Sequence, residues 1–470
     1  MVDLDCDVAI IGAGTAGLAA ERSARANGAS TLLIDDRFAG TTCTTVGCMP
    51  SKLLIAAGEA AHAVRHAGVF GVRVDGSGVD GPAVMRRVRR ERDAFVASTK
   101  RSFDVLPPGV AVQASARFVG RDELVLDDGR RVKARSIVIA TGSAPHVPAM
   151  FDDVRDRLLT NETVFELLDL PKSVGVIGAG PLGLELAQAL ARLGVDVVVF
   201  EPGERIAGLA DAKLEGTLRA ALEAEFTIRT KVELSVSPAA DGVTLRWSKA
   251  AGDERRFERL LVSTGRPPRL DALDLATTGL ALDDHGVPHF DRHSLQCGDS
   301  SIFIAGDANH DLAVLHEAAS QGAIAGWNAA GPRVRPERRE VPLSIMFTDP
   351  AMATIGVGLH PDATTIVGRA SYADQGRAKI IDRAVGLAHL YADPIDGRLI
   401  GACMIGPGVE HTAHLVAWMV QLRQTADDVL RLPFYHPTIE EGLKPALEEI
   451  CEQLDRRRPV DRDPGPSPGA

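Results

Sequence analysis

The chain has 470 residues, of which 45% are hydrophobic and 24% charged, and its formal net charge is −11. This length predicts roughly two to four domains, and the composition is that of a globular protein. A negative charge without a basic stripe argues against nucleic-acid binding. No apolar run approaches the roughly 20 residues that cross a bilayer, and the acidic N-terminus leads into a strand instead of a secretory signal. We therefore expect a cytoplasmic protein without a nucleic-acid or membrane partner.

The start of the chain has the pattern of a nucleotide-binding βαβ unit. An apolar run precedes Gly12, Gly14 and Gly17, an alanine-rich segment follows, and a second apolar run ends in Asp35. In such a unit the glycines permit a tight turn, close approach of a pyrophosphate, and close packing of helix on strand. The helix N-terminus offers unpaired N–H groups to the phosphates, and the acid accepts hydrogen bonds from ribose hydroxyls.

The same pattern occurs a second time. Gly178, Gly180 and Gly183 follow another apolar run, and the next apolar run ends in Glu201. The same interval separates the first glycine from the acid in both copies. One fingerprint is weak evidence, whereas two, each with its strand, helix and acid, favour nucleotide binding over a pair of structural turns.

Two cysteines, Cys43 and Cys48, lie just after the first fingerprint. They place a potential dithiol or disulfide beside a bound dinucleotide, which predicts electron transfer between sulfur and a cofactor. A thiol near a helix N-terminus ionises more readily, and a nearby cysteine allows reversible disulfide formation. The alternative is a pair of small buried side chains. We expect no metal site, because no further Cys or His flanks the pair at zinc-ligand spacing.

The later segments indicate further domains. Two apolar strands end in Thr-Gly, at Gly142 and Gly265, and another leads to Asp307. From about residue 340 the glycine fingerprints stop, and strand-like runs alternate with amphipathic segments, which predicts an α+β domain. Residues 456–470 are rich in Arg, Asp, Pro and Gly and predict a disordered tail.

In this order the landmarks resemble the flavoprotein disulfide reductases, and in particular their dihydrolipoamide dehydrogenase members. The resemblance extends from Asp7 to about Leu454. It rests on the first fingerprint with Asp35, the Cys43–Cys48 pair with Pro50-Ser51-Lys52, Ala140-Thr141-Gly142, the second fingerprint, Ser263-Thr264-Gly265-Arg266, Ala305-Gly306-Asp307, Phe347-Thr348-Asp349-Pro350 and His436-Pro437-Thr438-Ile439-Glu440-Glu441.

The resemblance implies an α/β fold with two Rossmann-like dinucleotide-binding domains, for FAD and NAD, and a C-terminal α+β interface or dimerisation domain. It implies a discontinuous FAD-binding domain at 1–147 and 271–338, an NAD-binding domain at 148–270 and an interface domain at 339–455. The active form would be a homodimer in which His436 is donated across the interface.

The resemblance also implies which residues hold the cofactors. For FAD they are Gly12, Gly14, Gly17, Asp35, Thr42, Lys52, Thr141, Gly142, Gly306, Asp307 and His316, and for NAD they are Gly178, Gly180, Gly183, Glu201 and Gly265. Asp307 would contact the ribityl chain, and the backbone at His316 would face the flavin's pyrimidine edge. We expect NAD over NADP, because a carboxylate at Glu201 suits a free 2′-hydroxyl and repels a 2′-phosphate.

In the same family roles, Cys43 exchanges with the substrate and Cys48 lies beside the flavin ring. His436 would accept a proton from the substrate dithiol, with Glu441 holding one ring nitrogen. Lys52 and Glu185 would form a pair near the flavin N5. The chain departs from the usual family stretch at the disulfide, where it has Thr41, Thr44, Thr45 and Met49 in place of Gly, Leu, Asn and Ile.

The implied reaction converts dihydrolipoamide and NAD⁺ to lipoamide and NADH, and a lipoylated protein of a 2-oxo acid dehydrogenase complex is a candidate partner. Three alternatives stay open. The first is an NADH-dependent reductase of another small disulfide or electron acceptor. The second is mercuric reductase, which the lack of a vicinal cysteine pair near the C-terminus disfavours because Cys451 stands alone there. The third is a non-catalytic redox-sensing flavoprotein, which the set of Cys43, Cys48, His436 and Glu441 disfavours.

Overall fold

The computed structural model describes residues 3–76, 78–248, 253–359 and 361–456. These residues form four sheets with helices packed on them, as an α/β fold requires. Except for Arg456, the predicted tail lies outside the described residues.

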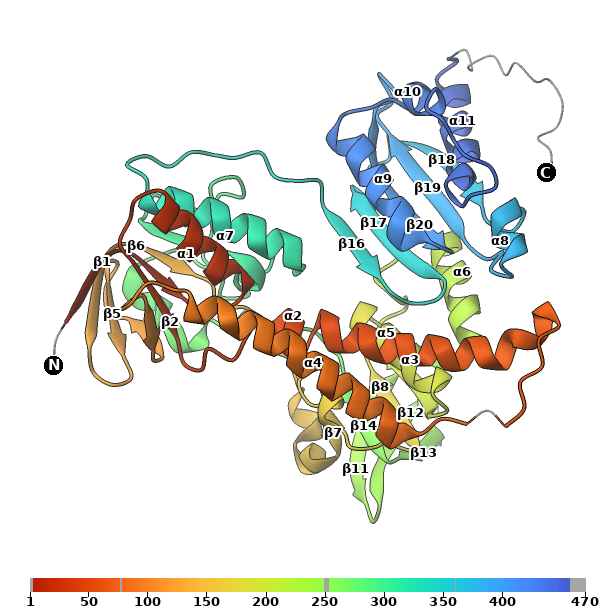
Figure 1. The fold of residues 1–470 in the computed structure, drawn as a ribbon, viewed down its shortest axis with the longest axis horizontal. Coiled ribbons are helices and arrows are strands. Elements are labelled where there is room, and N and C mark those ends of the chain that lie inside the picture. The colour runs from red at the N-terminus through yellow and green to blue at the C-terminus, as the bar shows by residue number, and fades with distance from the viewer. Residues whose placement is uncertain (1–2, 77, 249–252, 360, 457–470) are drawn as a thin grey trace.

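The first sheet is mainly parallel and lies at the left of Figure 1. Its strands are β1 (Leu4–Ile11), β2 (Thr31–Asp35), β3 (Ala111–Gln113), β4 (Ala116–Phe118), β5 (Glu123–Leu126), β6 (Arg131–Ile139) and β15 (Ile302–Ile304). Their order is β3-β2-β1-β6-β5-β4, and β15 pairs with β6 from far along the chain. The central strands are continuous apolar runs because helices and loops cover both faces of the sheet.

Helices α1 (Thr15–Ala26) and α7 (Leu315–Ala330) pack side by side over this sheet (Figure 1). Their close approach depends on glycines of α7. A Cβ at Gly322 would lie 2.1 Å from the carbonyl oxygen of Ala16, and one at Gly326 would lie 2.1 Å from that of Ala20. Since both positions face backbone of α1, only glycine fits there.

Three helices follow β2 and lead away from the first sheet. They are α2 (Thr42–Thr45), α3 (Cys48–His66) and α4 (Gly81–Asp104). Helices α2 and α3 carry the two cysteines, and α3 packs along α5 (Pro181–Arg192) of the next region. This contact brings the two fingerprint regions together.

The second sheet is entirely parallel, in the order β10-β9-β8-β14-β7. Its strands are β7 (Leu158–Leu159), β8 (Ser173–Ile177), β9 (Asp196–Glu201), β10 (Thr227–Thr230) and β14 (Arg259–Val262). Helix α6 (Ala212–Glu223) belongs to this region, as does an antiparallel sheet of β11 (Glu233–Ala239), β12 (Gly242–Ser248) and β13 (Asp253–Phe257).

The C-terminal sheet is antiparallel, in the order β16-β17-β20-β19-β18. Its strands are β16 (Leu343–Met346), β17 (Ala351–Gly356), β18 (Ile366–Ser371), β19 (Leu387–Ala392) and β20 (Leu399–Gly406). The helices of this part are α8 (Gly376–Ile380), α9 (Val409–Gln421), α10 (Ala426–Leu430) and α11 (Lys444–Gln453). Strands β19 and β20 confirm the strand-like runs in the sequence, and the mixture of strands and helices confirms the α+β prediction.

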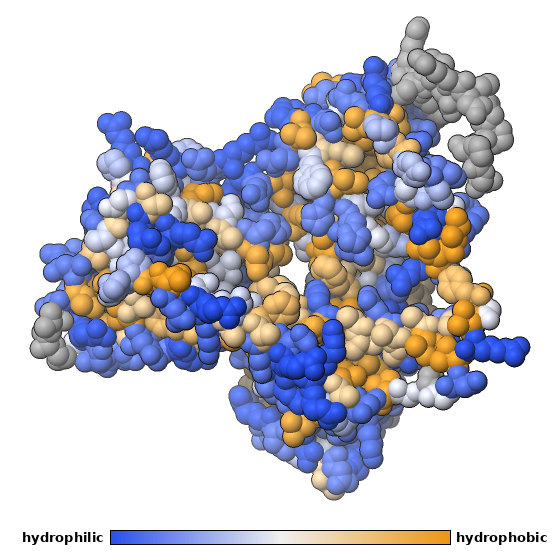
Figure 2. Space-filling model, in the orientation of Figure 1, coloured by the Kyte–Doolittle hydropathy of each residue, from blue (hydrophilic) through white to orange (hydrophobic). Residues whose placement is uncertain are grey.

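The C-terminal sheet lies above α3 and α5, and a connecting segment joins it to α7 (Figure 1). The molecule is hollowed between the part that carries α1 and α7 and the part that carries β16 and β17 (Figure 2). Strand β15 pairs with β6, although the strands of the second sheet lie between them in the sequence, so the first domain is built from two separate segments. We propose that residues 1–147 and 271–338 form this domain, that residues 148–270 form the second and that residues 339–455 form the third. In the parts of the chain that the structure describes, no helix combines the length and the apolar character needed to cross a membrane.

The packing of α7 on α1 gives a test of the fold. We expect Gly322→Ala to lower the free energy of unfolding by about 1–3 kcal/mol, because the new methyl group overlaps backbone of α1 that cannot move independently. Thermal unfolding checks this expectation. The control is Gly216→Ala in α6, where a Cβ meets nothing within 4 Å and the free energy should rise by about 0.5–1 kcal/mol. Equal melting temperatures for the two variants would contradict the packing.

Candidate active site

The first glycine fingerprint forms a tight turn between β1 and α1. Gly12 has φ +104°, its N–H donates to Ile34 O at 2.7 Å, and a Cβ there would lie 2.4 Å from Ala140 O. A Cβ at Gly17 would lie 1.8 Å from Gly12 O, whereas one at Gly14 meets nothing within 4 Å. The backbone is therefore crowded on the protein side and open where a phosphate would approach.

The second fingerprint has the same geometry between β8 and α5. Gly178 has φ +103°, and its N–H donates to Phe200 O at 2.8 Å. A Cβ at Gly183 would lie 2.2 Å from Gly178 O, and one at Gly180 again meets nothing. The repeated sequence pattern thus folds into two turns with matching contacts.

The acid at the end of each unit holds its own fingerprint loop. Asp35 Oδ2 accepts from the N–H of Ala13 at 2.9 Å, and Glu201 Oε2 accepts from the N–H of Ala179 at 2.8 Å. The other oxygen of each carboxylate accepts a backbone N–H from the turn that follows. Both carboxylates are therefore fixed at the ends of their strands before any nucleotide binds.

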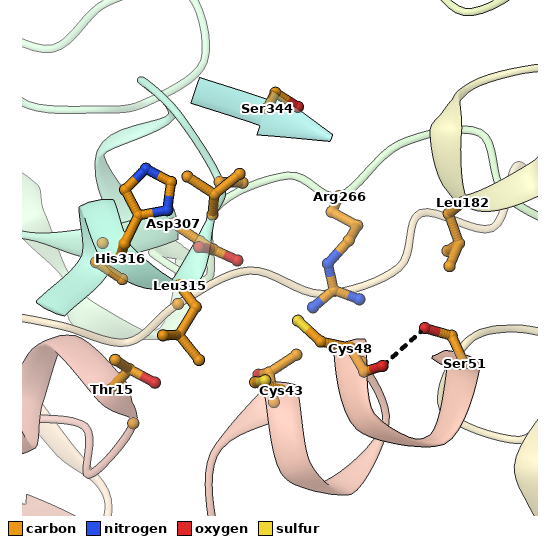
Figure 3. A pocket seen from close by; sticks show the side chains of 18 of the residues that line it. Thr15, Cys43, Cys48, Ser51, Leu182, Arg266, Asp307, Leu315, His316 and Ser344 are labelled. Carbon is orange, nitrogen blue, oxygen red and sulfur yellow. Dashed lines mark hydrogen bonds between the residues drawn. The ribbon is translucent and has the colours of Figure 1, made fainter. Parts of the chain in front are cut away.

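A cavity of about 520 Å³ lies between the two fingerprints, at the carboxyl end of the first sheet. The predicted site residues that line it are Gly14, Thr42, Cys43, Cys48, Lys52, Gly142, Glu185, Gly306, Asp307 and His316. Residues of the C-terminal part also line it, among them Ser344, Phe347 and His414. Figure 3 shows the cysteines on one side of the cavity and Asp307, Leu315 and His316 on another.

The two cysteines are free thiols with different environments. Cys43 lies in α2, and Cys48 is the first residue of α3 and is exposed to the cavity. The pKa of Cys48 is lowered because the Cys43 thiol donates a hydrogen bond to its thiolate and the Lys52 ammonium attracts the negative charge, although burial acts the other way. The pKa of Cys43 is raised by the same hydrogen bond and by burial. Cys48 is therefore the thiol that ionises first.

The threonines that depart from the family stretch make hydrogen bonds within the turn that carries Cys43. Thr41 has φ −87° and caps α2, with its hydroxyl accepting from the N–H of Thr44 at 3.4 Å. The hydroxyl of Thr45 donates to Thr41 O at 2.8 Å. The positive φ of this turn falls on Gly40, at +110°, so a β-branched residue fits at Thr41 without strain.

Lys52 and Glu185 form an ion pair between α3 and α5, with Nζ 2.7 Å from Oε2. The Glu185 side chain is 6% exposed, and its other oxygen accepts from the backbone N–H of Phe347 at 2.8 Å. The Lys52 ammonium also lies 4.4 Å from the centre of the Phe347 ring. The cation is thus held at the cavity wall by two regions of the chain at once.

Arg266 joins the cysteine turn to Asp307 through a network that the sequence analysis did not predict. Its guanidinium donates to Asn161 Oδ1 at 2.8 Å and to Ser143 Oγ at 3.2 Å. Asn161 donates to Val46 O at 3.0 Å, between the two cysteines in sequence, and Ser143 donates to Asp307 Oδ2 at 2.8 Å. Figure 3 shows the guanidinium of Arg266 pointing toward the cysteines. Arg266 stands in one of the quoted motifs, whereas Asn161 and Ser143 carried no sequence signal.

His436 and Glu441 lie together but not at this cavity. His436 Nδ1 is 3.1 Å from Glu441 Oε2, which also accepts from the N–H of Thr438 at 3.2 Å. The His436 side chain is 54% exposed, and it does not line the cavity that holds the cysteines. Two histidines line the cavity: His316, which the sequence analysis predicted, and His414 of α9, which it missed.

The residues at the first fingerprint fit the expected FAD. The hydroxyl oxygen of Thr141 is buried and has no hydrogen-bond partner in the described parts of the chain. The next residue, Gly142, has φ +71° and an open side, and Gly14 is open as well. These features leave open backbone and one buried hydroxyl without a hydrogen-bond partner, as a site for a bound nucleotide requires. The described residues include no cluster of three or more His, Cys, Asp or Glu side chains arranged to hold a metal ion.

Comparison with known families gives two matches. The model of the pyridine nucleotide-disulphide oxidoreductase family matches residues 6–322, and the model of the dimerisation domain of that family matches residues 342–447. Together they cover the three sheet-bearing regions around the cavity.

Individual proteins extend the match over nearly the whole chain. Dihydrolipoyl dehydrogenase 3 of Pseudomonas aeruginosa is 30% identical, and dihydrolipoyl dehydrogenase of Bacillus subtilis is 29% identical; each alignment covers 94% of this chain and 97% of the relative. Among solved structures, the HOCl-induced flavoprotein disulfide reductase RclA from Escherichia coli has a TM-score of 0.80 at 20% identity, and LpdA from Mycobacterium tuberculosis has 0.80 at 23%. Each structural match covers 94% of this chain and 99% of the other and shows a shared fold.

The environment of the cysteines predicts a pH dependence. In the reduced protein, the rate of Cys48 alkylation should increase with pH, and the midpoint of this increase should lie at a pKa below that of an ordinary thiol. The pKa is low because Cys43 and Lys52 stabilise the thiolate. Cys43→Ala removes the hydrogen bond, so the pKa of Cys48 should rise by about 1 unit. The rate of iodoacetamide labelling as a function of pH, followed by mass spectrometry at Cys48, measures the shift.

Three of the other cysteines interfere little with this measurement. Burial raises the pKa of Cys6, Cys297 and Cys403 to about 12, with Asp7 adding to the rise at Cys6. Cys6→Ala is the matched control and should leave the Cys48 profile unchanged. An unshifted profile in Cys43→Ala would show that Cys43 does not stabilise the thiolate.

Proposed function

This chain belongs to the pyridine nucleotide-disulphide oxidoreductase family, and we propose that it is a dihydrolipoamide dehydrogenase, which oxidises dihydrolipoamide to lipoamide while NAD⁺ is reduced to NADH. It is an oxidoreductase that acts on sulfur groups, with FAD and NAD(H) as its cofactors. The observation that carries the proposal is the Cys43–Cys48 dithiol at a cavity between two nucleotide-binding turns. We take the proposed substrate from the dihydrolipoyl dehydrogenases that align with 94% of the chain.

Two sets of residues would hold the cofactors. The FAD set is Gly12, Gly14, Gly17, Asp35, Thr42, Lys52, Thr141, Gly142, Gly306, Asp307 and His316, and the NAD set is Gly178, Gly180, Gly183, Glu201 and Gly265. When bound, FAD would transfer the two electrons of the dithiol to the nicotinamide ring of NAD⁺. The protein sets the positions of these groups and the ionisation of the sulfur atoms.

The sulfur chemistry follows from the asymmetry of the two cysteines. A thiolate of dihydrolipoamide attacks Cys43 Sγ of the oxidised pair, a substrate–Cys43 disulfide forms, and Cys48 leaves as a thiolate. This direction is favoured because the sulfur with the lower pKa is the better leaving group. The second substrate thiol then attacks the substrate sulfur of the mixed disulfide, which releases lipoamide and returns Cys43 as a thiol. The two electrons now reside on the cysteine pair.

Proton transfer requires a base that can reach the substrate sulfur. We assign it to His436 of the partner subunit, because in its own chain His436 is exposed and does not line the cavity. Its contact with Glu441 would orient the imidazole and stabilise the charge that develops on it.

A homodimer agrees with two features of the C-terminal part. That part matches a dimerisation domain, and it exposes large apolar side chains at Trp418, Leu422 and Tyr435. Such side chains are typical of surfaces that a partner covers. A lipoylated protein of a 2-oxo acid dehydrogenase complex is the proposed physiological partner.

The second candidate is an NADH-dependent reductase of another small disulfide or electron acceptor. It is favoured by the cysteine turn, where Thr44 and Thr45 replace residues of the usual family stretch next to Cys43. This change lies next to the sulfur that we assign to substrate exchange, whereas Cys43, Cys48 and Lys52 are the residues of the usual family stretch. Mercuric reductase and a non-catalytic flavoprotein have no such observation in their favour.

The first test is steady-state reduction of NAD⁺ by dihydrolipoamide with FAD-loaded protein. We expect turnover in the wild type and a loss on the order of 10³-fold or more in Cys48→Ser, because the serine cannot form the disulfide. Cys6→Ser is the matched control and should keep wild-type turnover. If NADH reduces the oxidised pair but dihydrolipoamide gives no turnover, the substrate is another disulfide or acceptor.

The second test concerns the nucleotide. The wild type should use NAD⁺ in preference to NADP⁺, because the Glu201 carboxylate repels a 2′-phosphate. Glu201→Gln keeps an oxygen for the N–H of Ala179 and removes the charge, so the ratio of kcat/KM for the two nucleotides should fall by about 10-fold. Glu204→Gln removes a charge in the same turn and should leave the ratio unchanged. A wild-type preference for NADP⁺ would refute the assignment.

A further inference from the structure

A buried glutamine of α5 makes hydrogen bonds to the backbone of the segment that follows β16. Gln188 is 3% exposed, and its side-chain amide makes two hydrogen bonds to the backbone of Asp349. Nε2 donates to Asp349 O at 2.8 Å, and Oε1 accepts from the N–H of Asp349 at 2.8 Å. The amide therefore holds this backbone as a neighbouring strand would, independently of the side chain at position 349.

Gln188 lies one helical turn after Glu185, so both side chains project from the same face of α5. The segment that Gln188 fixes also includes Phe347, whose N–H donates to Glu185 Oε1 and whose ring lies below the Lys52 ammonium. With Oε1 occupied, Glu185 presents Oε2 to Lys52. The position of the Asp349 backbone thus affects two of the groups that surround the lysine.

We infer that Gln188 is a positioning residue for the redox step: it holds the Phe347 segment in the place that sets the Lys52–Glu185 pair beside the cysteine dithiol. The inference rests on the proposed function, because it assigns Gln188 a part in the electron transfer from that dithiol. Gln188 itself touches no reacting atom.

The segment packs closely against α5. A space of only about 10 Å³, enough for a single water molecule, remains among Glu185, Gln188, Arg192, Phe347 and Asp349. Arg192 holds the side chain of Asp349, at 3.0 Å from Oδ2, but makes no bond to its backbone. Gln188 therefore holds the Asp349 backbone within the turn that joins the paired strands β16 and β17, and the side-chain anchor does not replace its two hydrogen bonds.

The charges that face Cys48 make this dependence measurable. They are Lys52, which lowers its pKa, and Glu185, which raises it, together with the hydrogen bond from Cys43; the Arg266 guanidinium also points toward the cysteines (Figure 3), but it is held by Asn161 and Ser143. If Phe347 moves away, Glu185 loses the N–H that offsets its charge and draws Lys52 toward itself. Both changes raise the pKa of Cys48.

The experiment uses full-length, FAD-loaded Gln188→Leu and Gln188→Glu. In the reduced protein, the pH profile of Cys48 alkylation should shift upward by about 0.5–1 unit in each variant. In turnover with dihydrolipoamide, kcat should fall by about 10-fold while KM stays within about 2-fold. If Gln188→Leu does not fold, Gln188→Glu decides, because it still accepts the N–H of Asp349 but faces Asp349 O without a donor.

The matched control is Glu225→Gln. Glu225 accepts from Gln188 Nε2 at 2.8 Å and pairs with Arg192, and its hydrogen bonds and ion pairs in the described parts of the chain do not include Asp349 or Phe347. It should lower the melting temperature and leave the Cys48 profile at its wild-type position. A wild-type Cys48 profile in folded Gln188 variants would overturn the inference. The alkylation profile is recorded without dihydrolipoamide. If the wild type gave no turnover with dihydrolipoamide, the proposed substrate would be wrong, but the effect of Gln188 on Cys48 could still be read from the profile.

Discussion

The ion pair between Lys52 and Glu185 is the contact on which the rest of the site depends. It joins α3, which begins at Cys48, to α5, which begins at the second fingerprint. The Lys52 side chain is 33% exposed, so the pair is desolvated on one side and open to the cavity on the other. Desolvation makes an ion pair unfavourable unless its remaining atoms are hydrogen-bonded. The N–H of Phe347 donates a hydrogen bond to the second oxygen of Glu185, so the C-terminal part of the chain also stabilises the ion pair.

The chemical difference between the two cysteines arises from this arrangement. Both side chains are thiols, and only five positions separate them in the sequence. Cys48 starts a helix and lies one turn before Lys52, whereas Cys43 is partly buried and donates to Cys48. The direction of disulfide exchange that we propose therefore follows from where α3 begins. Because α3 is held in place by α5, the packing of the two helices also maintains the difference between the thiols.

The part of the site that the sequence predicts is the part governed by local constraints. Gly12, Gly178, Asp35 and Glu201 each act within one βαβ unit, so their spacing alone indicates the turn that they form. The His436–Glu441 contact is local in the same way.

The networks around Arg266 and Gln188 join residues more than 100 positions apart. Asparagine, serine and glutamine are also common at surfaces. Their roles become visible only when the packing of the sheets is known.

The threonines of the cysteine turn show where this chain differs from the usual family pattern. The hydroxyls of Thr44 and Thr45 both donate to Thr41 O within the turn that carries Cys43, and the Thr44 hydroxyl also accepts from Thr99 of α4 at 3.5 Å. None of these bonds involves Lys52, Glu185 or Cys48. The Lys52–Glu185 pair therefore lies outside the hydrogen bonds of these threonines, whereas Cys43, the other group that lowers the pKa of Cys48, lies in the same turn as the threonines. We therefore expect any change in substrate preference to arise at the Cys43 turn and to reach Cys48 through the contact between the two cysteines.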